Sequence, residues 1–293
     1  MELLKNCPIC DASDFELFIS GNDYFLSGES FQIMRCKKCG FRFTNPRPEA
    51  EKLGQYYQSA EYISHSNNRK GILNFLYQLV RKYLLFRKYA LICKFYNAGE
   101  ILDIGCATGH FLNLMQKKGW KTTGIEPDEK TRMWAKSKFN LNIFPEEQLE
   151  EFAEASFDVI TMWHVLEHVS DLNTRIAQIS RLLKKEGILI IAVPNCKSYD
   201  AIKYLGFWAG YDLPRHLSHF CVSDIYKLTK KYNLIIHEIK PMTFDAYYVS
   251  LLSEKYKTGK IRWFSGLFNG FWSNIKSANI NNFSSLIYLI KLK

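Results

Sequence analysis

The sequence contains no long hydrophobic run and no segment with the pattern of an export signal. No apolar segment of the 293-residue chain reaches the roughly 18 uninterrupted residues that a membrane span requires. Residues 1–7 lack the basic-then-apolar order of a secretory signal peptide. Hydrophobic residues make up 47% and charged residues 23% of the chain, the composition of a folded globular protein. We therefore expect a cytoplasmic protein and leave open a peripheral contact with the inner membrane surface.

Half of the eight cysteines lie in two C-x-x-C pairs near the N-terminus. Cys7 and Cys10 form the first pair, and Cys36 and Cys39 form the second after 25 intervening residues. In a reducing compartment, two such pairs are typical of a zinc ion held by four thiolates rather than of a disulfide framework. A pair of redox dithiols is the alternative, although neither pair opens a helix between two strands. We predict a structural Zn²⁺ ribbon over residues 1–48.

The formal charge is +10, and the positive excess is concentrated in two stretches. Residues 66–98 hold seven Lys or Arg and no acid, and residues 226–293 hold eleven against three acids. Both stretches interleave aromatic residues, a pattern that permits an anionic partner such as a phosphate-bearing substrate, a membrane surface or a nucleic acid. Ordinary amphipathic helices with solvated lysines would give the same pattern.

Hydrophobic patterning divides the chain into the ribbon, a helical linker or cap over 49–98, and an α/β region over 99–293. In the α/β region, short apolar runs alternate with amphipathic stretches, which indicates a parallel sheet wrapped by helices. The expected strands are Ile101–Ile104, Lys121–Ile125, Phe157–Met162, Ile188–Val193, Leu234–Ile239 and Ser285–Leu292. The expected helices are Phe111–Lys118, Glu129–Phe139, Asn173–Leu183 and Ser223–Lys231.

An inserted segment near residues 250–283, before the last strand, is rich in aromatic residues and lysine. We expect it to form amphipathic helices that roof the substrate pocket. Contact with an anionic membrane is the alternative.

The turn after the first strand of the α/β region carries two glycines where a ligand can approach the backbone. Gly105 and Gly109 occupy this turn, and the amides of the following helix point to it. Glu126 directly follows the second strand, where a carboxylate can accept both ribose hydroxyls. These residues predict an adenosine-containing cofactor. The spacing Gly105-x-x-x-Gly109 lacks the G-x-G-x-x-G needed for a dinucleotide pyrophosphate.

Together with the segments 157–169 and 187–195, this pattern resembles the class I S-adenosylmethionine-dependent methyltransferases. The resemblance implies an α/β fold with a Rossmann-like seven-stranded sheet, helices on both of its faces, and S-adenosyl-L-methionine as cofactor. Within that class, the chain resembles bacterial enzymes that carry a cysteine ribbon and act on nucleotide sugars or on cell-surface polysaccharide or lipid intermediates. The cofactor residues that the resemblance implies are Asp103 at the ammonium group, Gly105, Cys106 and Gly109 at the methionine part, Glu126 and Pro127 at the ribose, Glu147 at the adenine edge, and His164.

The segment Tyr211–Phe220 follows the fifth strand, on the side where this fold faces the methyl acceptor. His216 is the predicted base for the acceptor's proton, and His219 and His164 are further catalytic candidates, because neutral imidazole titrates in the right range. In ribbon-bearing sugar C-methyltransferases this place holds a Glu-His pair, and here Arg215 stands where the glutamate would be. The predicted substrate-binding residues are Tyr211 and Arg215. The Arg215 guanidinium is expected to bind a phosphate or carboxylate of the substrate by two hydrogen bonds. The alternative is that these histidines only pack the loop.

His164, Glu167 and His168 have the spacing that places three side chains on one side of a helical turn, where they could bind a divalent ion. Quinone O-methyltransferases show a comparable Glu-x-x-Glu-His arrangement. The same residues also occur in this fold without a metal, where they pack the cofactor's rim, so the sequence leaves this point open.

The predicted reaction is methyl transfer to a small, lipid-linked or nucleotide-linked acceptor, in the first place a sugar or cell-surface glycan intermediate. A quinone or phenol O-methyltransferase and an RNA methyltransferase are the alternatives. The segment Met162–Val165 lacks the Asn-Pro-Pro-aromatic motif of base-amine methylation, so no nucleic acid partner is expected. The complete set of Gly105, Gly109 and Glu126 argues against a non-catalytic binding module.

Overall fold

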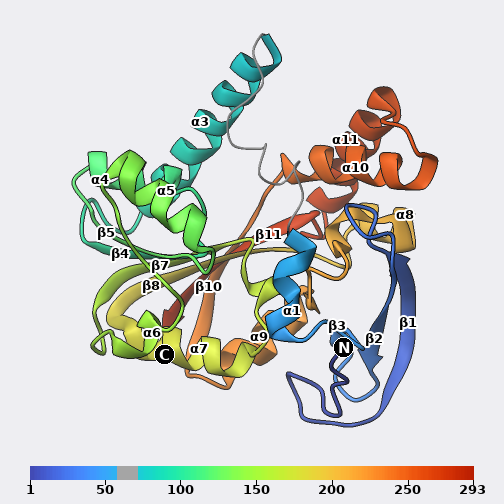
Figure 1. Ribbon diagram of the computed structural model, residues 1–293, viewed down its shortest axis with the longest axis horizontal. Helices are drawn as coiled ribbons and strands as arrows, with labels where there is room; N and C mark the ends of the chain where they lie inside the picture. Colours follow the sequence, from blue (N-terminus) through green and yellow to red (C-terminus); the bar gives the residue numbers. More distant parts are fainter. Residues whose placement is uncertain (58–71) are drawn as a thin grey trace. The chain divides into compact units, whose positions relative to one another are not determined.

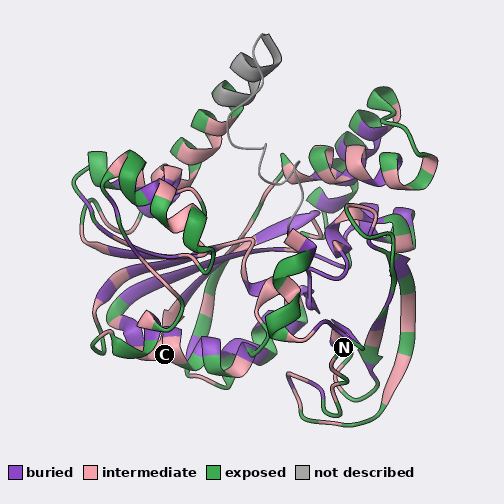
Figure 2. Ribbon diagram, in the orientation of Figure 1, coloured by how far each residue is buried: buried purple, intermediate pink, exposed green. Residues whose placement is uncertain are grey.

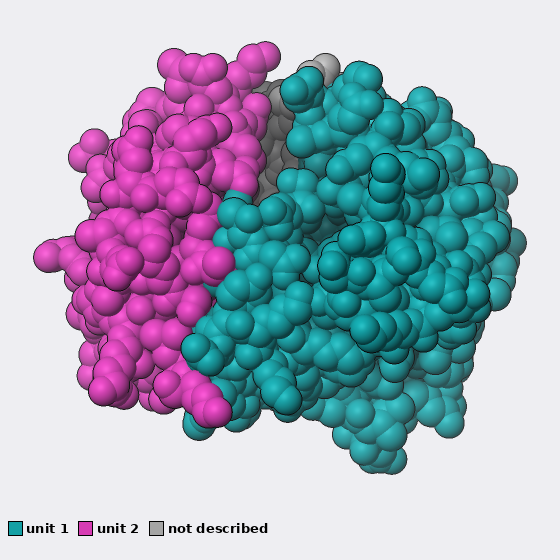
Figure 3. All heavy atoms as spheres, turned by 90° about the horizontal axis from the view of Figure 1, so that it is seen from below, with its two compact units in different colours: residues 1–59, 164–176, 191–288 teal, residues 60–163, 177–190, 289–293 magenta. Residues whose placement is uncertain are grey.

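The computed structural model describes residues 1–57 and 72–293. The part of the expected 49–98 linker that spans 58–71 lies outside the described residues, as do Arg69 and Lys70 of the first basic stretch. Contacts within the chain define two compact units, coloured separately in Figure 3. Unit 1 comprises residues 1–59, 164–176 and 191–288, and unit 2 comprises residues 60–163, 177–190 and 289–293.

A small antiparallel sheet follows the first cysteine pair in unit 1 (Figure 1). Its strands are β1 (Phe15–Asn22), β2 (Ser30–Cys36), β3 (Arg42–Thr44) and β9 (Ser218–His219), in the order β1-β2-β3-β9. Alternating side chains of β2 enter the core, where Phe31 and Ile33 are buried. The first three strands lie within the predicted ribbon segment 1–48, whereas β9 comes from a distant part of the chain that the ribbon pattern did not include. A short helix α1 (Ala50–Leu53) and a 3₁₀ turn η1 (Gly54–Tyr57) follow.

Unit 2 contains four neighbouring strands that pair in parallel. They are β4 (Glu100–Ile104), β5 (Lys121–Ile125), β6 (Asn142–Phe144) and β7 (Phe157–Trp163). The helices of this unit are α3 (Ile72–Ile92), α4 (His110–Lys117), α5 (Glu129–Phe139) and α6 (Gln148–Glu151). Because Ile101, Leu102 and Ile104 are all essentially inaccessible, the apolar runs form the interior strands that their composition predicts.

The complete large sheet has seven strands in the order β10-β11-β8-β7-β4-β5-β6, which confirms the predicted fold class. The strands not yet named are β8 (Leu183–Pro194), β10 (Leu234–Pro241) and β11 (Ser285–Leu292). The remaining helices are η2 (Leu166–His168), α7 (Leu172–Leu182), α8 (Tyr199–Tyr204), η3 (Leu205–Phe207), η4 (Ala209–Tyr211), α9 (Val222–Lys230), α10 (Asp245–Thr258) and α11 (Trp263–Ala278). Among the described residues, none of the helices has the length and apolar character needed to span a bilayer.

Candidate functional site

The turn between β4 and α4 has the backbone conformation of a ligand-binding loop. Gly105, Ala107 and Gly109 all have positive φ angles, of 72°, 46° and 69°. A side chain at Gly109 would place its Cβ 2.7 Å from Leu141 Cδ1, so both the conformation and the space require glycine there. No side chain caps the N-terminus of α4 at Gly109. The first amides of α4 are therefore available to a ligand.

Glu126 connects this turn to the end of β5. Its Oε2 accepts the Ala107 backbone N–H at 2.9 Å, and its Oε1 accepts the Asp128 N–H at 3.0 Å. Burial raises the pKa of Glu126 although both amides favour its charged form. A carboxylate has about four lone-pair sites, so two remain for a bound diol. The predicted ribose ligand thus also fixes the glycine turn.

Asp103 lies on β4 beside Gly124 of β5 and is only 3% exposed. Its Oδ1 accepts the Thr161 hydroxyl at 2.6 Å. Burial raises the pKa of Asp103 to about 6, against the opposing effect of Thr161. A carboxylate held in this way is charged at neutral pH and would attract a cationic ligand group.

The other predicted cofactor residues are less uniform in position. The Cys106 thiol is buried. A Cβ added to Gly124 would lie 2.7 Å from its sulfur, so the thiol packs directly against Gly124. Pro127 is exposed next to Glu126, and Glu147 is exposed at the start of α6, just after the strand that pairs with β5. His164 belongs to unit 1, whereas the other predicted cofactor residues all belong to unit 2.

The four ribbon cysteines lie together as a zinc site requires. The Sγ–Sγ distances are 3.6 Å for Cys7–Cys39 and for Cys10–Cys36, and all four sulfurs lie within 4.8 Å of one another. Tetrahedral Zn²⁺ with Zn–S bonds of about 2.3 Å would separate its sulfurs by roughly 3.8 Å. Burial raises the pKa of the Cys7 thiol to about 11, so a cation is needed to stabilise the thiolate at neutral pH. The donor set fits a structural zinc ion.

The ribbon also contacts the segment Tyr211–Phe220, which carries His216 and His219. Strand β3 pairs antiparallel with β9, with Arg42 opposite His219. Thr44 donates its N–H to the Leu217 carbonyl at 3.0 Å and its hydroxyl to the His216 carbonyl at 2.7 Å. No local sequence signal links residues so far apart. The ribbon and the segment Tyr211–Phe220 therefore pack together within unit 1.

His216 is oriented by a backbone carbonyl. Its Nδ1 lies 2.9 Å from the Gly210 carbonyl oxygen, which can only accept, so Nδ1 carries a proton and donates it. Its Nε2 lies 4.0 Å from Glu167 Oε1 and 4.0 Å from Asp212 Oδ2. The residue remains 8% exposed. Two carboxylates therefore lie where they would stabilise a proton gained at Nε2.

His219 is buried and His168 is half-buried, and the pKa of each is lowered. His219 is 3% exposed, its Nε2 contacts the Thr44 hydroxyl at 3.0 Å, and burial holds its pKa well below the usual range. Burial, followed by the nearby His216, lowers the pKa of His168 to about 4, and its Nδ1 lies 3.0 Å from the Arg215 carbonyl. Both rings are therefore neutral at neutral pH.

His164 has a carboxylate at each ring nitrogen. Its Nε2 lies 3.0 Å from Asp245 Oδ2, and its Nδ1 lies 3.4 Å from Glu167 Oε1. Burial alone would lower its pKa, but Asp245 and Glu167 outweigh burial and raise the pKa to about 10. At neutral pH this ring is an imidazolium, which suits it to holding charge rather than to accepting a proton.

Glu167 is 1% exposed, and neither of its carboxylate oxygens has a hydrogen-bond partner among the described residues. The sequence spacing grouped it with His164 and His168 on a helical turn. The structure instead has His164 at a positive φ of 57° before the 3₁₀ turn η2. The three groups whose ligand atoms lie within 4.8 Å of one another are Glu167, His168 and His216.

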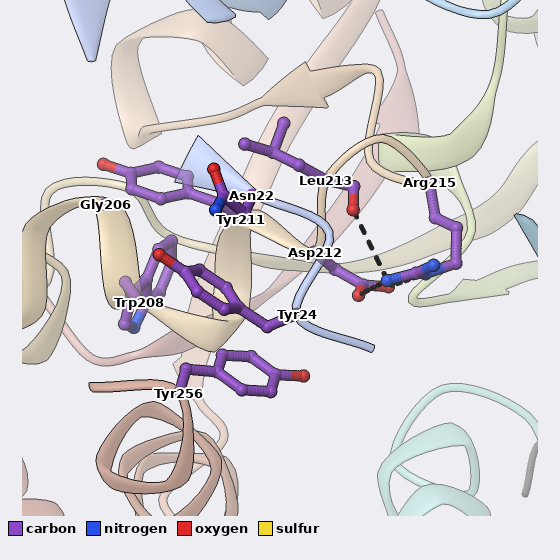
Figure 4. A pocket seen from close by; sticks show the side chains of 9 residues that line it. All are labelled: Asn22, Tyr24, Gly206, Trp208, Tyr211, Asp212, Leu213, Arg215 and Tyr256. Atoms are coloured by element: carbon purple, nitrogen blue, oxygen red, sulfur yellow. Dashed lines mark hydrogen bonds and ion pairs between the residues drawn. The ribbon is translucent and has the colours of Figure 1, made fainter. Parts of the chain in front are cut away.

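Arg215 and Tyr211, the predicted substrate residues, line a small hollow in unit 1 (Figure 4). The Arg215 side chain is nevertheless engaged internally, since its Nη2 donates to Asp212 at 2.7 Å and to Asp23 at 3.0 Å. These carboxylates outweigh burial and raise the pKa of Arg215 further. Tyr211 is 3% exposed and packs edge-on against Trp208. The guanidinium charge is thus balanced within the protein, a pairing that the sequence did not reveal.

The comparisons with known proteins agree with this architecture. A family model described as "Methyltransferase domain" matches residues 75–239, more than half of the chain. The chain belongs to this family and is by class an S-adenosylmethionine-dependent methyltransferase.

Two curated relatives carry the name "Ubiquinone biosynthesis O-methyltransferase". One, from Pelagibacter ubique (strain HTCC1062), is 30% identical over 159 residues, which cover 50% of this chain and 65% of the relative. The other, from Rickettsia bellii (strain OSU 85-389), is 24% identical over 199 residues, which cover 63% and 83%. A geranyl diphosphate methyltransferase in complex with SAM is similar in fold, with a TM-score of 0.55, 13% identity, and coverage of 84% of this chain and 96% of that one. The [4+2]-cyclase SpnF has a TM-score of 0.54 at 15% identity, covering 84% and 98%.

Proposed function

We propose that the protein transfers the methyl group of S-adenosylmethionine to the hydroxyl oxygen of a phenolic, quinol-type acceptor. The observation that carries this proposal is the placement of His216, whose Nδ1 donates to the Gly210 carbonyl and whose Nε2 lies 4.0 Å from each of two carboxylates. The names of the relatives favour a phenolic acceptor over the sugar or glycan intermediate that the ribbon suggested.

The proposed chemistry is a proton removal coupled to an in-line displacement. The acceptor O–H gives its proton to His216 Nε2, and the oxygen then forms a bond to the methyl carbon. The bond from carbon to the sulfonium breaks, and its electron pair stays on sulfur as a neutral thioether. Glu167 and Asp212, each 4.0 Å from Nε2, stabilise the imidazolium that forms. A phenol, with a pKa of about 10, is far easier for imidazole to deprotonate than an alcohol.

Elimination among the histidines supports this assignment. His164 lies between two carboxylates that keep it protonated, and His219 is a buried partner of Thr44. His168 is half-buried with its Nδ1 at the Arg215 carbonyl, and its pKa is lowered to about 4. In this proposal, His164 is a charged partner of two carboxylates and His219 is a structural residue, although both were predicted to be catalytic. Arg215 and Tyr211 line the hollow and do not bind the substrate directly.

The test is transfer of labelled methyl groups to an ortho-diphenol and to a nucleotide sugar by the wild type, His216→Ala and His219→Ala. His216→Ala should retain cofactor binding and lower turnover on the diphenol by about 100- to 10,000-fold. His219→Ala is the matched control and should cost stability more than turnover per folded molecule, since its ring is buried against Thr44. Near-normal turnover with earlier melting of His216→Ala would remove the catalytic role. Transfer only to the sugar would overturn the proposed acceptor.

A divalent ion at Glu167, His168 and His216 is the second candidate for activating the acceptor, favoured by Glu167 Oε2, which accepts no hydrogen bond among the described residues. Metal analysis separates the two mechanisms. One zinc per chain, lost in Cys36→Ser, leaves His216 as the base. A second metal equivalent that disappears in Glu167→Gln would assign the three residues to an ion.

A further inference from the structure

Helix α11 has two unlike faces, and the large apolar side chains are on the outer one. The buried positions are Gly266, Asn269, Gly270, Ser273 and Ser277, all small or polar. The outer positions, here called the α11 face, are Trp263 (61% exposed), Phe264 (93%), Leu267 (45%), Phe268 (62%), Phe271 (51%), Trp272 (36%) and Ile275 (45%). Figure 2 shows the same alternation of exposed and buried positions along α11. A helix that covers a core has its large apolar side chains on the buried face, so α11 has the opposite arrangement.

The inner face cannot exchange places with the outer one. A Cβ on Gly266 would approach Leu251 Cα of α10 to 2.9 Å, and one on Gly270 would approach Tyr247 Cα to 2.7 Å. The two helices are thus in close backbone contact, as Gly-x-x-x-Gly spacing allows. Asn269 adds hydrogen bonds to Glu254 and the Tyr204 hydroxyl at 3.0 and 2.8 Å. The rotation of α11 is fixed, with its aromatic residues directed away from α10.

The chain from the end of α10 onward carries charge of one sign. From Lys255 to Lys293 the chain contains no Asp or Glu. The exposed cations on α11 and on the chain just before it are Lys255, Lys257, Lys260, Arg262 and Lys276. The Lys276 ammonium lies 5.3 Å from the centre of the Trp272 ring, which connects the basic rim to the aromatic surface.

We propose that the α11 face docks onto an anionic lipid bilayer, with the helix lying in the interfacial plane. Aromatic and aliphatic side chains on one side and lysines beside them are the features of an interfacial helix. Anionic headgroups would neutralise the basic rim, whereas a second copy of this chain would bring the same cations against one another. The 16-residue helix is too short to span, so the contact is peripheral. This docking replaces the roof expected from the sequence, and it does not depend on the identity of the methyl acceptor.

Vesicle sedimentation of the full chain tests this proposal. The probes are phosphatidylcholine vesicles with and without phosphatidylglycerol, each at roughly 10 mM and 1 M salt, because these salt concentrations screen charges over about 30 and 3 Å. The protein should sediment with the phosphatidylglycerol vesicles at low salt and much less at high salt. Absence of binding at low salt, or equal binding to both kinds of vesicle, would overturn the proposal.

Three variants separate the apolar and the electrostatic contributions. Phe264→Ser removes a side chain that is 93% exposed, so folding should be unaffected while vesicle affinity falls about tenfold. Lys260→Gln should lower affinity about fivefold. Met133→Ser, on α5 in unit 2 and 63% exposed, is the matched control and should bind like the wild type. If the protein instead forms a concentration-dependent dimer that Phe264→Ser dissociates, without vesicle binding, a second copy occupies the face and the proposal is wrong.

Discussion

Replacing Glu126 with alanine should weaken S-adenosylmethionine binding by roughly 10- to 150-fold. The carboxylate already accepts two backbone N–H groups, from Ala107 and Asp128, and has lone pairs left for the two ribose hydroxyls. Hydrogen bonds to a charged group contribute about 1.5–3 kcal/mol, and each 1.4 kcal/mol is a factor of ten in affinity. The variant also loses the acceptor that holds Ala107 at its positive φ of 46°. The glycine turn should therefore be less ordered before the cofactor arrives.

Isothermal titration calorimetry with the wild type and two further variants measures this effect. Glu126→Gln keeps an acceptor oxygen without the charge and should fall between the wild type and the alanine variant. Glu129→Ala, three residues later on the exposed start of α5, is the matched control and should bind normally. Unchanged affinity of Glu126→Ala would refute both the ribose assignment and the reasoning from the turn.

Two further predictions concern the ribbon and the acid dependence of cofactor binding. Cys36→Ser should lose the single zinc and melt at a lower temperature, because four thiolates fill all positions of a structural site. Cys93→Ser, at a half-buried cysteine outside the ribbon, should keep the zinc content and the melting temperature of the wild type. Unaltered zinc content and melting temperature in Cys36→Ser would contradict the ribbon. Cofactor affinity should fall as the pH drops through about 6, since burial raises the pKa of Asp103 to that value and only its charged form attracts the ammonium group. The sign for stability is opposite, because a raised carboxyl pKa favours folding below about pH 4 and this contribution is lost as the pH rises through about 6. Asp103→Asn should give a flat profile in the same titration, and a profile that still bends near pH 6 would assign the dependence to another group.

The strands and the cofactor turn could be predicted because their signals are local. A buried interior strand such as Ile188–Val193 is apolar throughout, and a turn with positive φ favours glycine at positions such as Gly109. The final strand was predicted at its observed bounds, Ser285–Leu292. These features depend on a few neighbouring residues, so the sequence pattern was sufficient.

The acceptor region could not be predicted in the same way because distant residues determine it. Arg215 pairs with Asp23 across 192 positions of sequence. His164 is charged because Asp245 lies beside it, at the start of α10 and before the segment 250–283 that the sequence predicted to be helical. The i, i+3, i+4 spacing of His164, Glu167 and His168 would hold only on a regular helix, and the chain instead turns at a positive φ. Periodicity contains no information on such pairings.

The pairing of β3 with β9 has a consequence for the order in which the protein can assemble during synthesis. The ribbon strands leave the ribosome first, but Thr44 meets the His216 carbonyl only after 172 further residues. At roughly 5–20 residues per second, this delay is about 10–35 s. Throughout that time β3 is an open sheet edge, the kind of surface at which chains pair with one another. Nascent or truncated chains that end before residue 218 should therefore aggregate through β3, however well the zinc site itself has formed.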